Sequence, residues 1–249
     1  IVVNGVNANQ ATLIRSYLQA VVGSWAAELA GQTAPALDVQ ARTRFNEAND
    51  SHYYLVPGVI VTIMTMIGAL LTSLVMAREY ERGTLESLFV TPVGSGEILT
   101  AKAATNFLLG MVSLAISMVF AAFVFDIPIR GSLLLLLAVS ALFLIVALGL
   151  GLVISTATKN QFLACQFAIM GTFMPALMLS GFLYDILNMP PAVRAVTYLI
   201  PARYYVTLLQ TLFLAGDIPS VIIPCCITLG VFAVVLMSIA RLKAPKSLE

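Results

Sequence analysis

The sequence predicts an all-α polytopic membrane protein with a small α/β domain outside the bilayer. The chain has 249 residues, of which 60% are hydrophobic and 10% are charged, with a mean hydropathy of +0.97. A soluble domain carries about 25% charged residues. The apolar residues come in blocks of roughly the 20 residues that an α-helix needs to cross a bilayer. The first fifty residues differ from the rest because they are more polar.

Residues 1–54 predict a partial strand–helix–strand domain. The opening "IVVNG" is typical of a strand that ends in a turn, and it suggests that the chain begins inside a longer protein. From Gln10 to Ala30 the apolar residues fall at helical spacing on one face. Apolar and polar residues then alternate from Leu37 to Phe45, as in a half-buried strand.

A transmembrane domain is predicted over residues 55–240, with a tail at 241–249. The segment at about 184–217 holds two amphipathic pieces punctuated by proline, which predict a re-entrant segment in the outer leaflet. None of the predicted spans has a charged residue at its centre, which argues against a proton relay or an ion-coupled carrier. The five predicted spans are about 55–77, 103–125, 132–155, 161–183 and 218–240.

The distribution of Lys and Arg predicts the orientation. Seven of these residues adjoin one set of connectors and three adjoin the opposite set, which places the first set in the cytoplasm. Residues 1–54 are then outside and the C-terminus is cytoplasmic, so a further span is expected before residue 1. The seven are Arg78, Arg82, Lys102, Lys159, Arg241, Lys243 and Lys246, and the three are Arg130, Arg194 and Arg203.

The first predicted cytoplasmic connector, residues 77–102, begins with the charged stretch "AREYERGTLESLFVTP". Leu85, Leu88 and Phe89 share one helical face, and glutamates dominate the polar face. Acidic side chains are repelled by an anionic leaflet, so the pattern favours docking on a cytoplasmic protein over lying in the headgroups. A plain solvated connector is the alternative.

This stretch, "EYERGTLESLFVTPV", resembles the Glu-x-Glu-basic-Gly-Thr signature of ABC-2-type transporter permeases, the membrane subunits of ABC exporters. The "LVPG" that opens the first predicted span and the segment 181–217 are similar to the same family, in its bacterial multidrug or lipid exporter branch. The resemblance implies a six-span bundle of the type V exporter kind, with the first span missing here. It also implies a dimer in the bacterial inner (plasma) membrane that binds two cytoplasmic ATPases.

The resemblance further implies that a coupling helix at about 78–97 transmits ATPase movement to the spans. ATP and Mg are expected on the partner ATPase, and no cofactor is expected on this chain. The ATPase-coupling residues would be Glu79, Glu81, Arg82, Gly83, Thr84 and Glu86.

A stripe of small hydroxyl residues follows one face of the first predicted span. Such a stripe is typical of helix packing in membranes, and lining of the substrate path or a dimer interface is the alternative. Gln166 in the fourth predicted span is another candidate for the path. The stripe consists of Thr62, Thr65, Thr72 and Ser73.

The predicted function is a permease subunit of an ATP-driven exporter that moves a hydrophobic or amphipathic substrate, a drug or lipid, out of the cytoplasm or inner leaflet. An ion-coupled carrier or channel and an intramembrane enzyme are the alternatives. The sequence holds no catalytic or phosphate-binding motif. Cys165, Cys225 and Cys226 lie in apolar runs and suggest packing, not a metal site. The expected partners are a cytoplasmic ABC ATPase subunit or domain, a second permease copy (in a homo- or heterodimer), membrane lipid and a periplasmic adaptor protein, with no nucleic acid.

Overall fold

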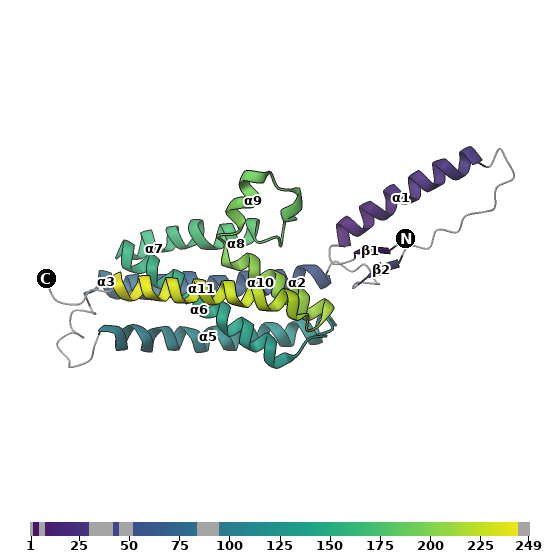
Figure 1. The fold of residues 1–249 in the computed structure, drawn as a ribbon. Helices are drawn as coiled ribbons and strands as arrows, with labels where there is room; N and C mark the ends of the chain where they lie inside the picture. Colours follow the sequence, from purple (N-terminus) through teal and green to yellow (C-terminus); the bar gives the residue numbers. More distant parts are fainter. Residues whose placement is uncertain (1, 5–7, 30–41, 45–51, 84–94, 244–249) are drawn as a thin grey trace.

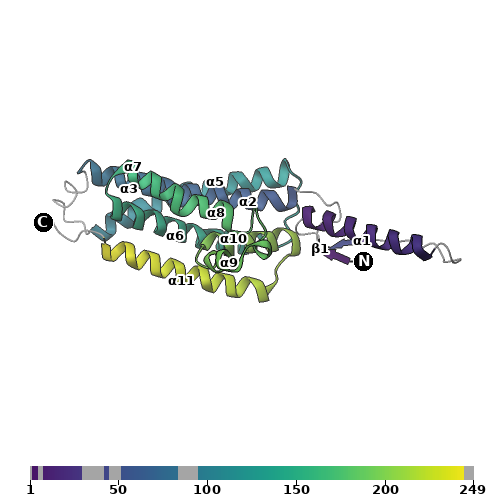
Figure 2. The same ribbon diagram turned by 90° about the horizontal axis from the view of Figure 1, so that it is seen from above.

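The computed structural model describes residues 2–4, 8–29, 42–44, 52–83 and 95–243. Across these ranges the chain is predominantly helical, and Figures 1 and 2 show an elongated bundle whose long helices run side by side. The bundle elements are α2 (His52–Thr65), η1 (Met66–Leu71), α3 (Thr72–Glu81), α5 (Ser95–Phe123), α6 (Leu133–Thr158), α7 (Gln161–Ala168), η2 (Ile169–Phe173), α8 (Met174–Leu179), η3 (Ile186–Asn188), α9 (Pro191–Thr197), α10 (Pro201–Gln210), η4 (Thr211–Ala215) and α11 (Pro219–Lys243).

Five helical stretches are long and apolar enough to cross a membrane, which confirms the predicted number of spans in the described residues. A helix suits these sequences because it satisfies every backbone N–H and C=O within the segment. The stretches are Leu55–Glu81, Ala101–Phe123, Leu133–Thr158, Gln161–Leu179 and Pro219–Leu242.

Two of the five stretches change helix type midway. The first runs through α2, η1 and α3, and the fourth through α7, η2 and α8, where η1 and η2 are π-helical. The two π-helical segments pack against each other. Short π-helical turns inside α-helices occur frequently at functional sites, so this junction is a place to look for one.

Helix α6 lies at the centre of the bundle and packs against α11, α3 and η1. Small residues allow the close approach of α6 to the first stretch. A Cβ added at Gly151 would lie 2.6 Å from the carbonyl oxygen of Ala69, and one added at Gly68 would lie 2.4 Å from the Cβ of Ala147. The tight contact between these helices is typical of small residues at membrane helix interfaces.

The segment predicted as re-entrant contains two short helices, α9 and α10, and each begins at a proline. Proline suits the first turn of a helix because its missing N–H would have no intrahelical partner there. Residues 191–196 of α9 are exposed, whereas Tyr205 of α10 is fully buried. The Tyr205 hydroxyl donates to Ser140 Oγ at 2.8 Å, and its ring stacks on Phe143 at 4.1 Å. Helix α10 is therefore part of the core, and its depth in the outer leaflet stays a prediction.

Near the N-terminus, β1 (Val2–Asn4) and β2 (Arg42–Arg44) form a parallel pair, with α1 (Ala8–Leu29) between them in the chain. Figure 1 shows α1 beyond the end of the bundle at which α2 begins. The apolar residues that predicted a helical face, such as Tyr17 and Trp25, are exposed. These two short strands are the only strands in the described ranges. The structure is therefore that of a predominantly helical membrane protein.

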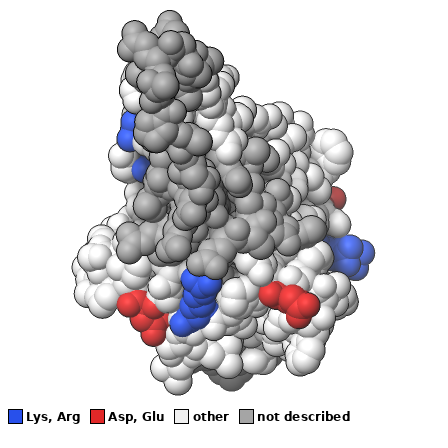
Figure 3. All heavy atoms as spheres, turned by 90° about the vertical axis from the view of Figure 1, so that its right-hand side faces the viewer, with Lys and Arg blue, Asp and Glu red and all other residues white. Residues whose placement is uncertain are grey.

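The two ends of the bundle carry different charges. Basic side chains lie where α3, α6 and α11 finish and where the second membrane stretch starts, and Figure 1 shows these points together at one end. At the opposite end, Arg130 donates to the Leu214 carbonyl oxygen at 3.1 Å, and Asp217 accepts from the Ser132 N–H at 2.9 Å. Figure 3 views the molecule from this opposite side and shows that most of the described surface there is uncharged.

Candidate functional site

The candidate site lies where α3 leaves the bundle for the charged connector. Helix α3 ends at Glu81, and Gly83 follows with φ of +67°. The left-handed conformation is easy for glycine and costs other residues roughly 1–2 kcal/mol. The Gly83 N–H donates to the Tyr80 carbonyl oxygen at 3.3 Å, which ends the helix. Gly83 therefore closes the last turn of α3.

Glu79 joins α3 to α5. Its carboxylate oxygen Oε1 lies 2.6 Å from Nζ of Lys102, near the start of the second membrane stretch. The two side chains are 24% and 26% exposed. An ion pair with this much shielding is screened less by salt than a fully exposed one, so it can hold the two helix ends together.

Glu81 joins α3 to α7. Its Oε2 accepts from the backbone N–H of Gln161 at 2.9 Å, at the first residue of α7. The first N–H groups of a helix have no intrahelical partner and carry a partial positive charge, so a carboxylate is favoured there. Arg78 adds a longer bond from Nε to Gln161 Oε1, at 3.4 Å. One turn of α3 is thus tied to two other helices.

A second polar contact between α3 and α5 lies deeper in the bundle. Nδ2 of Asn106 donates to Oγ1 of Thr72 at 3.1 Å, and both residues are buried. Thr72 lies seven residues before Glu79, and Asn106 lies four residues after Lys102. Two polar contacts, Glu79–Lys102 and Thr72–Asn106, therefore connect α3 to α5. The connector-end cluster, as we call it, comprises Arg78, Glu79, Glu81, Lys102, Asn106, Gln161 and Thr72.

The predicted coupling residues fall partly inside this cluster. Glu79 and Glu81 are in it, Arg82 is exposed beside it, and Gly83 terminates α3. Thr84 and Glu86 lie outside the described residues. The role of all six in coupling stays a prediction.

The predicted hydroxyl stripe lies largely inside the chain. Thr65, Thr72 and Ser73 are buried, and Thr62 is half-buried. A Cβ added at Gly151 of α6 would lie 2.9 Å from the Cβ of Thr72, so this part of the stripe faces α6. Thr72 also belongs to the connector-end cluster, whereas Gln166 is exposed on α7. A role of these residues in a substrate path or a dimer interface stays a prediction.

Sequence reasoning did not assign Lys102, Asn106 and Gln161 to the site. Lys102 and Asn106 are spaced by four residues, so they share one face of α5. This pair of polar residues, four positions apart at the start of a predicted span, was the feature of the sequence that could have identified them. Their partners on α3 were not visible from the sequence, because Glu79 is 23 residues from Lys102 and the Glu81–Gln161 bond joins residues 80 positions apart.

The members of the cluster link the end of α3 to the ends of α5 and α7. Among the residues that the structure describes, no group of three or more His, Cys, Asp or Glu side chains is placed to hold a metal ion.

Comparison with known proteins identifies the class of this chain. The family described as ABC-2 family transporter protein matches residues 1–242, so the chain belongs to the ABC-2 family, the membrane permeases of ABC transporters. With five membrane-capable helices, it is a multi-pass membrane protein of this family.

Individual relatives agree with this assignment. The chain is 44% identical to the probable multidrug ABC transporter permease YbhS of Escherichia coli (strain K12), over 100% of this chain and 67% of that protein. It is 30% identical to the probable multidrug ABC transporter permease YbhR of the same organism, over 86% of this chain and 58% of that protein. The inner membrane transport permease YhhJ is 27% identical, over 94% of this chain and 63% of that protein. The chain thus spans about two thirds or less of the length of these relatives.

Proposed function

We propose that this chain is the membrane-spanning subunit of an ATP-driven exporter that moves a hydrophobic or amphipathic substrate, a drug or lipid, out of the cytoplasm or inner leaflet. The observation that carries the proposal is the connector-end cluster, in which Glu79 and Glu81 tie the end of α3 to α5 and α7. The names of YbhS and YbhR support the multidrug class of substrate. The ATP and Mg would be bound by a partner ATPase.

The coupling step would run from the ATPase through the connector into the bundle. An ATPase docked on the helix at about 78–97 would shift the end of α3. Arg82 and Thr84 would meet the ATPase, together with Glu86, while Glu79 and Glu81 would pass the displacement to α5 and α7. This division follows from the partners that Glu79 and Glu81 have within the chain.

The proposed orientation places the connector end and the C-terminus in the cytoplasm of a bacterium, with residues 1–54 outside its inner membrane as a small α/β domain. The excess of Lys and Arg near the connector end supports it. In a cysteine-free background, a cysteine at Ser132 should react with an impermeant thiol reagent in intact cells. One at Lys159, at the other end of α6, should react only after permeabilisation. The reverse pattern would refute the orientation.

We further propose that two permease copies, identical or different, pair around the path and bind two ATPases. A periplasmic adaptor would extend the path beyond the membrane. Family membership supports the pairing and the ATPase partner. Because Thr65, Thr72 and Ser73 are covered by the chain's own helices, exposed apolar residues of the spans are better places to search for the contact between copies.

The test of coupling compares Glu81→Gln and Glu79→Gln in the full-length permease reconstituted with its ATPase. Both variants should bind the ATPase, but substrate should stimulate ATP hydrolysis several-fold less than in the wild type. Asp126→Asn is the matched control, since it makes the same chemical change at an exposed residue at the far end of the bundle. Stimulation equal to wild type in both glutamate variants would refute the coupling role.

The two alternative functions are separated by the same reconstituted system. An ion-coupled carrier would transport without ATP when an ion gradient is imposed. An intramembrane enzyme would convert its substrate chemically, which mass spectrometry of the recovered molecule would reveal. Transport of an unmodified molecule that requires ATP and the ATPase excludes both.

A further inference from the structure

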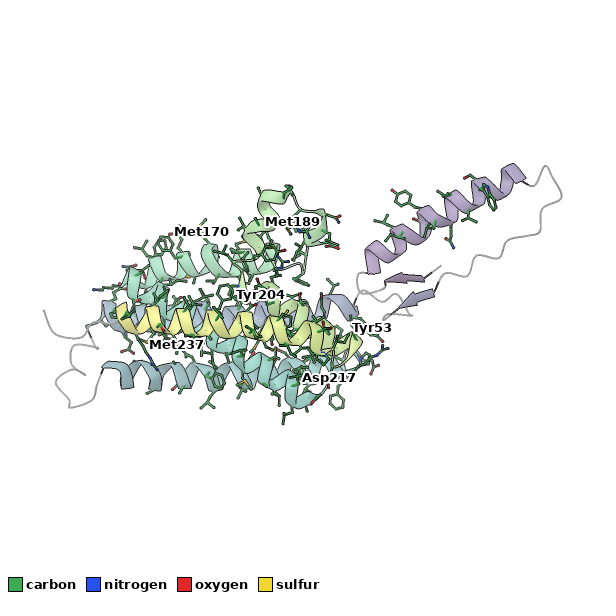
Figure 4. The ribbon with its side chains drawn as sticks, in the orientation of Figure 1. Tyr53, Met170, Met189, Tyr204, Asp217 and Met237 are labelled. Atoms are coloured by element: carbon green, nitrogen blue, oxygen red, sulfur yellow. The ribbon has the colours of Figure 1, made fainter. Side chains whose placement is uncertain are left out.

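The first and fourth membrane stretches are interrupted at the same depth of the bundle. Both interruptions, η1 and η2, are π-helical, and they pack against each other. Figure 4 shows Met170 of η2 between the connector end and the end of the bundle at which Tyr53 and Asp217 lie. The helices α5, α6 and α11 are α-helical over their whole length. Among the five membrane-capable stretches of the described residues, the interruptions therefore belong to this pair alone.

The local sequence accounts for the interruption in the fourth stretch. Pro175 lies at the start of α8 and has no N–H to donate, and in a regular α-helix its ring would clash with the carbonyl group of Gly171. Gly171 itself is a poor helix former. A wider turn avoids the clash, and the N–H of Met174 donates to the carbonyl oxygen of Ile169, five residues before it. The bend is therefore specified by the residues around Pro175.

A buried threonine lies at each interruption. Thr65 immediately precedes η1, and its hydroxyl donates to the Val61 carbonyl oxygen at 2.8 Å. Thr172 lies within η2, and its hydroxyl donates to the Ala168 carbonyl oxygen at 2.5 Å. Hydroxyl bonds to the carbonyl four residues back often bend a helix. Both threonines also line one cavity of about 90 Å³. In a close-packed interior such a space leaves room for movement at the two bends.

The two halves of each stretch have different neighbours. On the connector side of the interruptions α3 packs against α6 and α7, and on the other side α2 packs against α10 and α8. Figures 1 and 2 show α3 and α7 together at the connector end, whereas α2 and α8 lie farther along the bundle. The two stretches are therefore divided into a connector-side pair, α3 and α7, and a far-side pair, α2 and α8.

The connector-side pair is tied together at the end away from the bends. Oε2 of Glu81 accepts from the N–H of Gln161 at 2.9 Å, and Nε of Arg78 donates to Oε1 of Gln161 at 3.4 Å. The carboxylate at the start of α7 is favoured by the partial positive charge of a helix N-terminus. A movement of the end of α3 therefore carries the start of α7 with it.

Helix α6 holds the first stretch in place at the bend. A Cβ added at Gly68 of η1 would lie 2.4 Å from the Cβ of Ala147, and one added at Gly151 would lie 2.6 Å from the carbonyl oxygen of Ala69. Small residues allow this close approach of the two backbones. The contact fixes one point of the first stretch against an unbroken helix, and the parts on either side of that point can turn about it.

We propose that η1 and η2 form one hinge, about which α3 and α7 swing as a single body relative to α2 and α8. Hinge motion needs a few residues that absorb the backbone change and rigid elements on both sides of them. The two π-helical segments are the first part, and the connector-side and far-side pairs are the second. The inference deepens the proposed transport function, on which it rests only for regarding the ATPase as the source of the movement.

Distances between spin labels test the hinge without ATP or the ATPase. The full-length permease, free of other cysteines, is labelled at two positions and reconstituted in nanodiscs. An excess of unlabelled permease ensures that only distances within one chain are measured. One label pair joins Phe162 of α7 to Ser238 of α11, and the other joins Met178 of α8 to Ile223 of α11. All four side chains are exposed.

The measurement is the width of the distance distribution from double electron–electron resonance. Because the hinge lets α7 move relative to α11, the distribution of the Phe162–Ser238 pair should be at least about twice as wide as that of the Met178–Ile223 pair. Equal widths in the wild type would overturn the hinge with no variant needed.

Two double variants show whether the bend is the cause of the wider distribution. Gly171→Ala with Pro175→Ala restores a backbone donor and favours a regular helix, and a Cβ at Gly171 meets open space. The Phe162–Ser238 distribution should then narrow toward the width of the other pair. Gly230→Ala with Pro224→Ala makes the same chemical changes in α11, which has no π-helical segment, and should leave the difference between the two widths as in the wild type. A wild-type difference in both variants would also overturn the hinge.

Adding the ATPase separates the hinge from the proposed function. A non-hydrolysable ATP analogue should shift the mean Phe162–Ser238 distance at least about twice as far as the Met178–Ile223 distance. Equal shifts in a permease that transports would overturn the hinge and leave the transport function standing. Unequal widths in a permease that shows no ATP-driven transport would refute the transport function and leave the hinge standing.

Discussion

The ion pair between Glu79 and Lys102 gives the sharpest prediction about the stability of the connector end. Its atoms are 2.6 Å apart, and about three quarters of each side chain is shielded from solvent. Fully exposed pairs contribute roughly 0.2–1 kcal/mol. With more shielding but a desolvation cost as well, we expect a coupling energy near the top of that range, about 1 kcal/mol.

A double-mutant cycle measures this coupling energy. The proteins are wild type, Glu79→Gln, Lys102→Gln and the double variant, and the free energy of unfolding is measured by titration with dodecyl sulfate in mixed micelles. The losses of unfolding free energy in the two single variants should add up to about 1 kcal/mol more than the loss in the double variant. Raising the salt concentration should reduce the coupling energy only modestly, because partly buried pairs are screened less than exposed ones.

The control cycle combines Lys102→Gln with Asp126→Asn at the far end of the bundle. Distant sites should add within about 0.3–0.5 kcal/mol. If the Glu79–Lys102 cycle is also additive within that margin, the pair does not hold α3 to α5, and the transmission route through Lys102 fails.

Three further predictions concern the described helices. Gly151→Leu should destabilise the bundle by at least about 1–3 kcal/mol, because its Cβ would lie 2.6 Å from a backbone oxygen. The control, Gly230→Leu, should change the unfolding free energy little. Equal effects of the two variants would refute the close packing of α6. Tyr205→Phe should lower the free energy of unfolding by about 1–3 kcal/mol, because the buried Ser140 hydroxyl loses its hydrogen-bond donor. Adding Ser140→Ala should recover part of that loss. A double variant no more stable than Tyr205→Phe would contradict this account. Gly83→Val should lower the unfolding free energy by roughly 1–2 kcal/mol because φ is +67°, and a variant as stable as wild type in the same titration would show that this turn is not fixed.

Hydropathy was sufficient to predict the membrane bundle, because spans are defined locally. The five stretches at Leu55–Glu81 and beyond coincide with the apolar blocks of the sequence to within a few residues at most ends. The main difference is at the first stretch, where the helix continues through Arg78 and Glu79 to Glu81. A helix does not stop at the edge of the apolar block when its charged residues find partners, as Glu79 does in Lys102.

The cluster at the connector end shows what a local pattern cannot predict. The charged stretch marked the right place in the sequence, but it suggested that the glutamates face a partner protein or solvent. In the structure Glu79 and Glu81 also have partners within the chain, on α5 and α7, while Glu81 stays exposed to solvent. Which side chain a charge meets depends on how the spans pack around α6, and that packing is set by small residues such as Gly151 whose contacts are far apart in the chain.

Helix α10 extends this reasoning to the apolar core. Its sequence, "PARYYVTLLQ", is too short and too polar to cross a bilayer, so the pattern predicted a segment in the outer leaflet. Short polar helices are excluded from lipid but not from the interior of a protein, where a tyrosine hydroxyl can be satisfied, as Tyr205 is by Ser140.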